Sequence, residues 1–340
     1  MTFDWRTVRA DMPWLLPSAT IAFGVLGAGA VLTIFSGFHA QLPLVKFIAG
    51  WATIMAIFGF GGMIAMIIGM LVRGEGELIA ALGSKMRAHR LQIASLAIGF
   101  FLAGILQLAF GWVKLQIPLL SPFWADPILA DLDAAIFTVD PWIPIRKVIG
   151  IGIYFTDYVY SLWYPATLFS LFGVLVRPRN SALVLSYFML WGIFGTITQA
   201  LLSSAGPIFW DRLGYGNRFA AMWDQTPIGS RMASDYLFDI YVNGTNEIAG
   251  GISAMPSMHV AMAAWIALST LGTKFAKLGI AYWAVVFVGS VALGWHYFLD
   301  GAVGTVGALA CYMIARWFFR GEHRREDADA PGPEARPASL

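Results

Sequence analysis

Several stretches of this chain run for more than eighteen residues with almost no charged side chain. A run of that length is long enough to cross the hydrocarbon core of a bilayer as an α-helix. The overall charge content agrees, because only 12% of the 340 residues are charged and 58% are hydrophobic, whereas roughly a quarter of a soluble domain is charged. The sequence therefore predicts an all-α fold, a polytopic bundle of membrane helices.

Eight segments have the hydropathy of candidate membrane helices. They cover residues 14–36, 44–72, 91–113, 149–176, 182–205, 256–271, 278–293 and 296–319. We expect the first to be a retained helix rather than a signal peptide, because Asp4 and Asp11 interrupt its basic flank. The chain then divides into residues 1–148, with three helices and an outer loop, residues 149–319, which hold the polar motifs described below, and a charged, Pro-rich tail at 320–340 that reads as disordered.

The positions of Lys and Arg predict the orientation. Basic residues flank the segments at Arg6, Arg9, Arg73, Lys85, Arg87, Arg90, Arg177, Arg179, Lys274, Lys277, Arg316, Arg320, Arg324 and Arg325. All of them fall on one side if eight helices alternate and both termini are cytoplasmic. The two long loops, ending near Val148 and Ala254, then lie on the outer side, the periplasmic side if the membrane is a bacterial inner membrane. Apolar positions 128, 129, 132, 136 and 137 predict a short helix in the first loop, lying on the outer leaflet or packed on the bundle.

Several classes of partner and cofactor find no support in the sequence. The net charge is +2, and no basic block has the density of a nucleic-acid-binding arm. The single cysteine, Cys311, lies in an apolar run, so neither an internal disulfide nor a thiolate metal site is expected. No cluster of metal ligands is visible, and we expect no metal, no cofactor and no protein partner.

The segment Ala254-Met255-Pro256-Ser257-Met258-His259 lies where a polar loop turns into an apolar run. Proline is favoured in the first turn of a helix, and Ser257 can satisfy free N–H groups there. A helix start of this kind binds anions, and His259 is placed to protonate a leaving oxygen on a bound phosphate. Taken alone, the pattern is more typical of a capped membrane helix with a satisfied buried histidine.

A second histidine opens the last candidate helix, in Gly294-Trp295-His296-Tyr297-Phe298-Leu299-Asp300, at the same outer level. Asp300 follows His296 by four residues, so both side chains project from one helix face. A carboxylate there can accept the Nδ1–H of the imidazole, fix its tautomer and raise its nucleophilicity. Ionisable groups in a membrane are costly and mark function, so this combination predicts a catalytic site.

Other polar side chains fall at the same depth. Asp157, Gln107 and Gln199 all lie in the outer third of their predicted helices, which favours a cavity that opens outward. Interhelical hydrogen bonding is the alternative for all three. A transporter with a His/Asp relay is a different class of function, but the inverted repeats typical of transporters are not found. A non-catalytic scaffold leaves the clustered polar residues unexplained.

The two histidine segments resemble the second and third signature motifs of the type 2 phosphatidic acid phosphatase superfamily. The resemblance is closest to the branch with inositol phosphorylceramide synthases, which are inositolphosphotransferases, and spans residues 151–319. Ser203-Ser204-Ala205-Gly206-Pro207 resembles the first motif weakly. The resemblance implies that His296 attacks phosphorus to form a phosphohistidine and that Asp300 orients it. It also implies that His259 protonates the leaving group and then activates the acceptor, which is water or an alcohol.

The chain departs from the phosphatase pattern in its cations. The phosphatase motifs carry a Lys and an Arg in the first motif and an Arg six residues before the third-motif histidine, where this chain has Ser290. Phosphoryl transfer needs cationic stabilisation of the phosphate oxygens. Arg212, Arg218 and Arg231 are the outer-loop candidates, with Arg212 first.

The expected phosphate-binding set is therefore Ser257, Gly206, Pro207, Arg212 and Asp157. The missing arginines favour transfer from a membrane lipid over hydrolysis. A plain lipid phosphate phosphatase remains open, and so does the substrate: phosphatidate, a prenyl pyrophosphate, phosphatidylinositol or a ceramide-type acceptor.

Overall fold

The computed structural model describes residues 12–38, 44–177, 180–245, 247 and 250–320. Every regular element in these ranges is helical. In chain order they are α2 (Leu15–Ser36), α3 (Leu44–Val72), α4 (Leu78–Ala88), α5 (Arg90–Leu120), α6 (Asp126–Phe137), α7 (Trp142–Ile149), η1 (Gly150–Gly152), α8 (Ile153–Ser161), α9 (Trp163–Val176), α10 (Ser181–Met189), η2 (Leu190–Gly195), α11 (Thr196–Leu201), η3 (Pro207–Phe209), α12 (Ala220–Asp224), α13 (Ile228–Asn243), α14 (Met258–Thr270), α15 (Ala276–Ala292) and α16 (Phe298–Phe318). The predicted all-α fold is confirmed.

Each of the eight expected segments is helical in the structure, but they are not eight straight spans. Among the described residues, five helices are long and apolar enough to cross a membrane: α2, α3, α5, α10 to α11 as one, and α16. The expected helix at 149–176 is broken between α8 and α9, where the chain bends by 45°, and the pair counts as a sixth span if taken together. The apolar helices α14 and α15 are shorter, with 13 and 17 residues.

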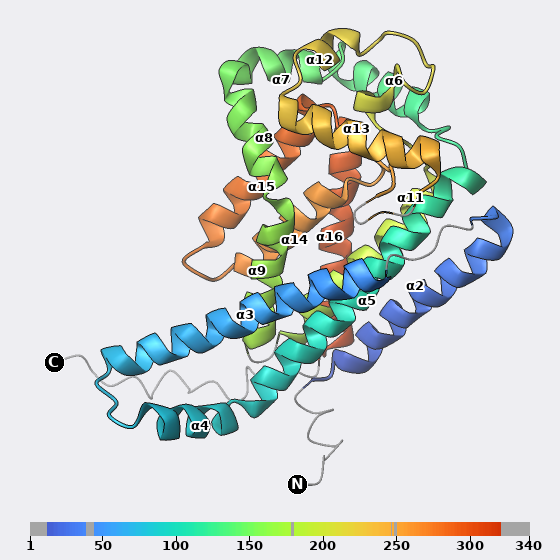
Figure 1. Cartoon of the computed structure of the whole chain (residues 1–340). Helices are drawn as coiled ribbons and strands as arrows, with labels where there is room; N and C mark the ends of the chain where they lie inside the picture. Colours follow the sequence, from blue (N-terminus) through green and yellow to red (C-terminus); the bar gives the residue numbers. More distant parts are fainter. Residues whose placement is uncertain (1–11, 39–43, 178–179, 246, 248–249, 321–340) are drawn as a thin grey trace.

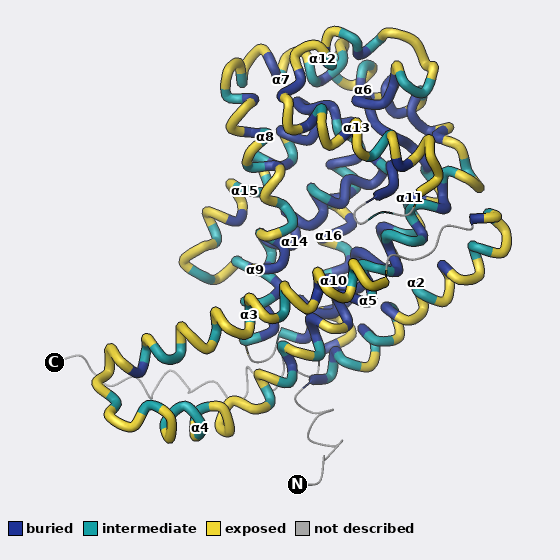
Figure 2. Tube along the Cα trace, viewed as in Figure 1, coloured by how far each residue is buried: buried dark blue, intermediate teal, exposed yellow. Residues whose placement is uncertain are grey.

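The centre of the bundle is formed by α10 and α14, whose side chains are largely buried, and by the one face of α16 that packs against them (Figure 2). Trp265 of α14 is fully buried and donates its indole N–H to the Leu183 carbonyl of α10 at 3.1 Å. Gly304 lets α16 approach the start of α14, because a Cβ atom there would lie 2.6 Å from the Ser257 carbonyl oxygen. This close packing sets the two histidine segments side by side.

The helices α6, α7, α12 and α13 cover one end of the bundle (Figure 1). Arg146 of α7 ties this cap together. Its guanidinium donates to the carbonyls of Ala292 at 2.6 Å and Met222 at 2.7 Å, and to the Thr226 hydroxyl at 2.9 Å. The expected short helix of the first loop is α6. It buries one face and leaves Ile128 on the other exposed.

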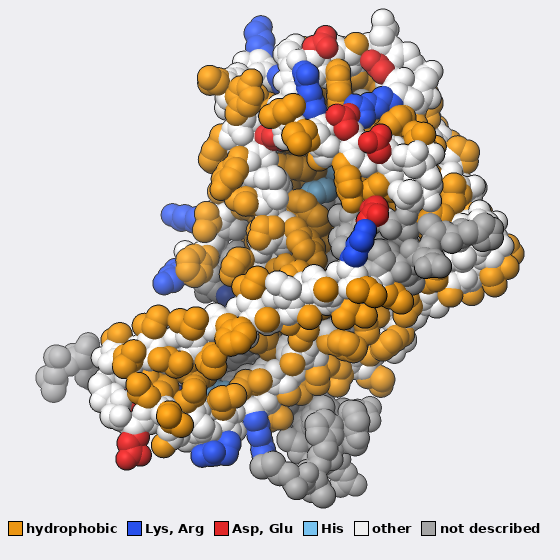
Figure 3. Space-filling view, in the orientation of Figure 1, with side chains coloured by type: hydrophobic (Ala, Val, Ile, Leu, Met, Phe, Trp, Pro, Cys, Tyr) orange, Lys and Arg blue, Asp and Glu red, His pale blue; other side chains and the backbone are white. Residues whose placement is uncertain are grey.

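The helix α3 lies at the edge of the molecule and exposes apolar side chains over most of its length (Figures 2 and 3). It crosses α5 obliquely (Figure 1). The indole N–H of Trp51 donates to the Phe100 carbonyl of α5 at 2.8 Å, and Gly104 leaves room for that ring. A helix with so much exposed apolar surface needs a lipid environment, and the chain is an integral membrane protein. The disordered tail expected at 320–340 lies outside the described residues, apart from Arg320.

Candidate active site

His296 lies just before α16 and is 4% exposed. Its Nδ1 lies 2.9 Å from the carbonyl oxygen of Ala254, a pair that requires the proton to be on Nδ1. The Asp300 carboxylate is next to the same nitrogen at 3.5 Å and is fully buried. The expected neighbour is therefore present, but the shorter contact of Nδ1 is with Ala254, and Asp300 accepts the backbone N–H of Tyr297 at 2.9 Å. Both contacts leave the Nε2 atom of His296 free of the proton.

The second-motif loop leads into α14, but the helix begins at Met258, so Pro256 lies just before it and not in its first turn as the sequence predicted. The Ser257 hydroxyl accepts the backbone N–H of Val260 at 3.3 Å and so caps the helix. The backbone N–H of Ser257 donates to the Asp300 carbonyl at 3.0 Å, which joins this helix start to α16. Ser257 is fully buried and its side chain is used by the cap. Its observed role is thus to hold the helix start beside the histidines.

His259 lies in the first turn of α14 between two aromatic rings. The Tyr160 ring stacks on it with centroids 4.8 Å apart, and the Trp163 ring meets it edge-on at 4.5 Å. The His259 and His296 rings are 5.8 Å apart. The two imidazoles predicted to act together are therefore close enough to contact one phosphate group from two sides.

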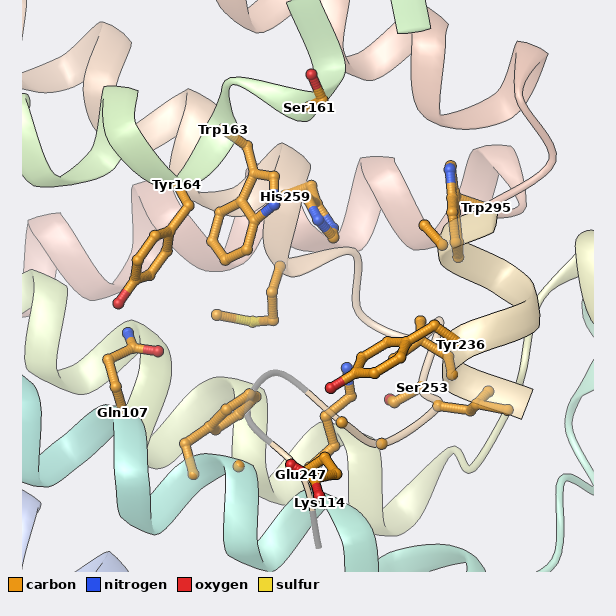
Figure 4. A pocket seen from close by; sticks show the side chains of 18 of the residues that line it. Gln107, Lys114, Ser161, Trp163, Tyr164, Tyr236, Glu247, Ser253, His259 and Trp295 are labelled. Atoms are coloured by element: carbon orange, nitrogen blue, oxygen red, sulfur yellow. The ribbon is translucent and has the colours of Figure 1, made fainter. Parts of the chain in front are cut away.

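Both histidines line a cavity of about 950 Å³. The cavity forms a hollow in the surface in Figure 3, and Figure 4 shows His259 on its wall. Its walls are mainly apolar and aromatic, and they include Trp51, Trp112, Trp163 and Trp191. The lining comes from α3 and α5 as well as from the helices that carry the histidines. A large apolar cavity with a few polar groups at one place is typical of a site for a hydrophobic ligand.

The polar residues expected in the outer third of the helices also line this cavity. Asp157 accepts a hydrogen bond from the Ser230 hydroxyl at 2.6 Å, and Ser230 accepts the indole N–H of Trp295 at 3.0 Å. Gln107 and Gln199 are on the cavity wall as well. Gln107 has both of the roles that were considered. It lines the cavity, and it forms an interhelical hydrogen bond by donating to the Tyr187 hydroxyl of α10 at 3.0 Å.

Gly206 and Pro207, of the weak first motif, lie behind the histidine loop rather than on the cavity wall. Gly206 has a φ of 99° and its Cα packs against the Trp295 carbonyl, where a Cβ atom would collide. The backbone N–H of Met255 donates to the Ser204 hydroxyl at 3.0 Å. The first-motif segment therefore fixes the loops that carry the histidines, and the structure shows no contact of Gly206 or Pro207 with the cavity.

The outer-loop arginines are not at the cavity either. Arg212, the first choice from the sequence, forms an ion pair with Asp235 and stacks on the Trp223 ring at 4.4 Å. Arg218 pairs with Asp131 and Asp140, at 2.7 Å each. Arg231 donates to backbone carbonyls of the α12 region. All three guanidiniums are already engaged within the cap, and none lines the cavity.

Two carboxylates that sequence reasoning did not single out hold the site loops. Asp126 accepts the backbone N–H groups of Ala205 at 2.7 Å and Gly206 at 2.8 Å, and the Tyr297 hydroxyl at 2.8 Å. Asp133, two turns further along α6, accepts the first N–H groups of α16, from Phe298 and Leu299. Burial raises the pKa of each of the two carboxyls to about 6, against the opposing effect of their N–H donors.

The spacing of these two aspartates in the sequence could have identified them. Asp126 and Asp133 are seven residues apart, on one face of a helix that is otherwise apolar on that face. A third residue without a role predicted from the sequence is Lys114, which lies on the cavity wall in the C-terminal part of α5. In the described part of the chain, no group of three or more His, Cys, Asp or Glu side chains is arranged to hold a metal ion.

A family model described as the PAP2 superfamily matches residues 131–314, more than half of the chain. The match includes His259, His296 and Asp300, and it leaves α2 to α5 outside. Comparisons with curated proteins and with solved structures found no match. Members of the matched family are phosphatases and phosphotransferases, so the coarse activity is that of an enzyme acting on phosphoric esters, and the chain belongs to the PAP2 superfamily.

Proposed function

We propose that this protein transfers a phosphorus-bearing group from a membrane lipid through a phosphohistidine on His296, as inositolphosphotransferase-type lipid synthases do. The observation that carries the proposal is the pair of imidazoles, 5.8 Å apart, on the wall of a large apolar cavity. The acceptor is an alcohol such as an inositol or lipid hydroxyl. If water takes its place, the same chemistry makes the protein a lipid phosphate phosphatase.

His296 is the nucleophile in this mechanism. The Ala254 carbonyl and the Asp300 carboxylate hold the proton on Nδ1, so the Nε2 lone pair is available to attack phosphorus. The attack forms a P–N bond and breaks the bond from phosphorus to the leaving oxygen. Asp300 also stabilises the positive charge that His296 gains in this step.

His259 serves as the acid and then the base. In its protonated form it donates a proton to the leaving oxygen, and afterwards it removes a proton from the acceptor hydroxyl that attacks the phosphohistidine. The rings of Tyr160 and Trp163 fix the orientation of this imidazole. The two histidines approach the phosphate from different sides. His296 can therefore attack phosphorus from one side while His259 protonates the leaving oxygen on the other.

Two features favour transfer over hydrolysis. The position of the third-motif arginine of the phosphatases is Ser290, whose hydroxyl donates to the Phe287 carbonyl and whose carbonyl accepts the His296 N–H. The cavity is also apolar and large, with room for an acceptor lipid beside the donor. We propose further that the cavity faces the outer, periplasmic side of a bacterial inner membrane, as the distribution of basic residues indicates.

The test is turnover of lipids by the purified protein in liposomes, with phosphatidate and phosphatidylinositol as donors and products identified by mass spectrometry. His296→Ala and His259→Ala should each lower the rate on the order of 10³-fold or more, and Asp300→Asn by roughly 10²–10⁴-fold. The matched control is His89→Ala, which removes an exposed histidine at the α4–α5 junction and should leave the rate unchanged.

The products separate the two forms of the reaction. A headgroup phosphate that appears on an added alcohol indicates transfer, and release of inorganic phosphate or of a free headgroup phosphate indicates hydrolysis. Full activity in His296→Ala would refute the proposed mechanism.

A further inference from the structure

Among the residues that the structure describes, no arginine lines the cavity to balance the charge of a phosphate. Developing negative charge on the phosphoryl oxygens needs a cation within contact distance. Arg212, Arg218 and Arg231 are engaged in the cap, and Arg146 donates to two carbonyls and a hydroxyl. Any cation that contacts the phosphate must come from the cavity wall itself.

Two lysines line the cavity, and only one is paired. Lys46 of α3 forms an ion pair with Glu247 at 3.0 Å. Lys114 of α5 has no hydrogen-bond or ion-pair partner anywhere in residues 12–38, 44–177, 180–245, 247 and 250–320. An ammonium group on an apolar wall without a counter-charge is costly. That cost is removed when an anion enters the cavity.

The position of Lys114 matches such an anion. Its side chain extends from α5 into the cavity, across from His259 (Figure 4). It shares the wall of this one cavity with both His259 and His296. A phosphate held between the two imidazoles therefore lies within the field of this one cation.

The loop before the second motif is shaped around the lysine stem. Gly251 has a φ of 90°, and a Cβ atom on it would lie 3.1 Å from Cγ and 3.3 Å from Cδ of Lys114. The same loop continues through Ala254, which accepts the hydrogen bond from His296. The backbone that fixes the nucleophile thus also confines the lysine, and the two groups are positioned together.

We propose that Lys114 binds the phosphate of the substrate, donating hydrogen bonds from its ammonium to the non-bridging oxygens. The cation then comes from a helix outside the region matched to the superfamily. Lys114 takes the place of the arginines that are missing from the superfamily motifs of this chain. This proposal rests on the proposed function for the identity of the anion, but the anion site itself is a separate claim.

The experiment measures orthovanadate binding to the full-length protein in detergent by isothermal titration calorimetry, together with lipid turnover. Lys114→Met should weaken vanadate binding at least 30-fold and lower turnover at least 100-fold, and Lys114→Arg should retain part of both. Lys147→Met, an exposed lysine of α7 away from the cavity, is the matched control and should change neither. Lys114→Met should fold as well as the wild type, because it removes an unpaired charge, and an unchanged or higher Tm checks this; Lys114→Gln serves as a second neutral variant.

Equal vanadate binding by the wild type and both neutral variants would overturn the proposal, and so would a wild type that binds no vanadate. Failure of the proposed function has a different signature: no lipid turnover and no phosphohistidine, with vanadate binding that still depends on Lys114.

Discussion

His296 shows how a side chain is prepared for chemistry by groups from distant parts of the chain. Asp300 was predicted from its spacing of four residues, on the premise that both residues share a helix face. That premise was wrong, because α16 begins at Phe298 and His296 lies before it, but Asp300 is still next to the imidazole, at 3.5 Å. The Ala254 carbonyl, 42 positions away in sequence, was not predicted, because a backbone acceptor in a loop has no sequence signature. Both neighbours act on the same Nδ1 atom and fix the same tautomer, so the expected chemistry does not depend on which one is closer.

Arg212 was the first of the three outer-loop arginines predicted to bind phosphate, because it follows Pro207 of the first motif by only five residues. The structure places its guanidinium against Asp235 and Trp223 instead. Lys114 was missed because the predicted third helix ended at residue 113, one residue short of it. Which cation faces a cavity is decided by tertiary packing, and neither composition nor spacing contains that information.

Asp126 gives a prediction at the same scale. Its folded pKa of about 6 lies above the ordinary value of 3.8 because of burial. Between these values the folded protein keeps a proton that the unfolded chain has released, so stability is greatest at low pH and falls as the pH rises to about 6. The loss is at most about 3 kcal/mol. Asp126→Asn cannot ionise, so the Tm of the wild type should fall relative to that of the variant between pH 4 and 7.

The measurement is the apparent Tm in detergent across that pH range. Asp131→Asn is the control, because Asp131 lies on the same helix with its side chain 78% exposed. A wild type and an Asp126→Asn variant with parallel pH profiles would show that this carboxyl does not titrate in the folded protein as described.

At the scale of elements, hydropathy located all eight helical segments and misjudged their shape. The break between α8 and α9 falls at Leu162, just before Pro165 in the first turn of α9, and proline is typical of such a helix start. Pro165 therefore marks a helix start in the sequence, but the continuous apolar run around it led to the prediction of one unbroken helix. The π-helical turn η2 within the α10–α11 span has no comparable signal. The bend matters for the site, because Tyr160 and Trp163, one on each side of it along the chain, both contact the His259 ring.

The cap helix α6 shows a second limit. The spacing of its apolar residues predicted a helix. That spacing left open whether the helix lies on the membrane or packs on the bundle. The structure shows packing through Asp126 and Asp133, which hold the loops of the first and third motifs. An amphipathic pattern describes the apolar face of a helix, but it does not identify the buried polar groups that set its position.

At the scale of the whole molecule, the superfamily match and the cavity do not have the same boundaries. The match begins at residue 131, yet Trp51, Gln107 and Lys114 line the cavity from α3 and α5. The helices before the match are therefore part of the site. Sequence reasoning separated residues 1–148 from 149–319, because the motifs lie in the second segment, and spacing along the chain cannot show that the first segment closes the cavity wall.

The proposed orientation is tested by cysteine labelling in intact cells. The only native cysteine, Cys311, is buried, so the background is low. Thr245→Cys, exposed next to α13, should react with a membrane-impermeant maleimide from outside. Ser84→Cys on α4 is the matched control and should react only after the cells are opened. If the Thr245→Cys variant is labelled only from inside, the orientation is reversed and the cavity lies on the cytoplasmic side.

The most direct test of the central claim is to trap the intermediate. The wild-type protein is mixed with a lipid donor labelled at phosphorus, quenched within milliseconds to seconds in alkali, where phosphohistidine survives, and digested for mass spectrometry. We predict one labelled peptide, with the phosphorus on His296, and no labelled peptide in His296→Ala. Turnover without any labelled histidine, or a label that persists in His296→Ala, would contradict the account.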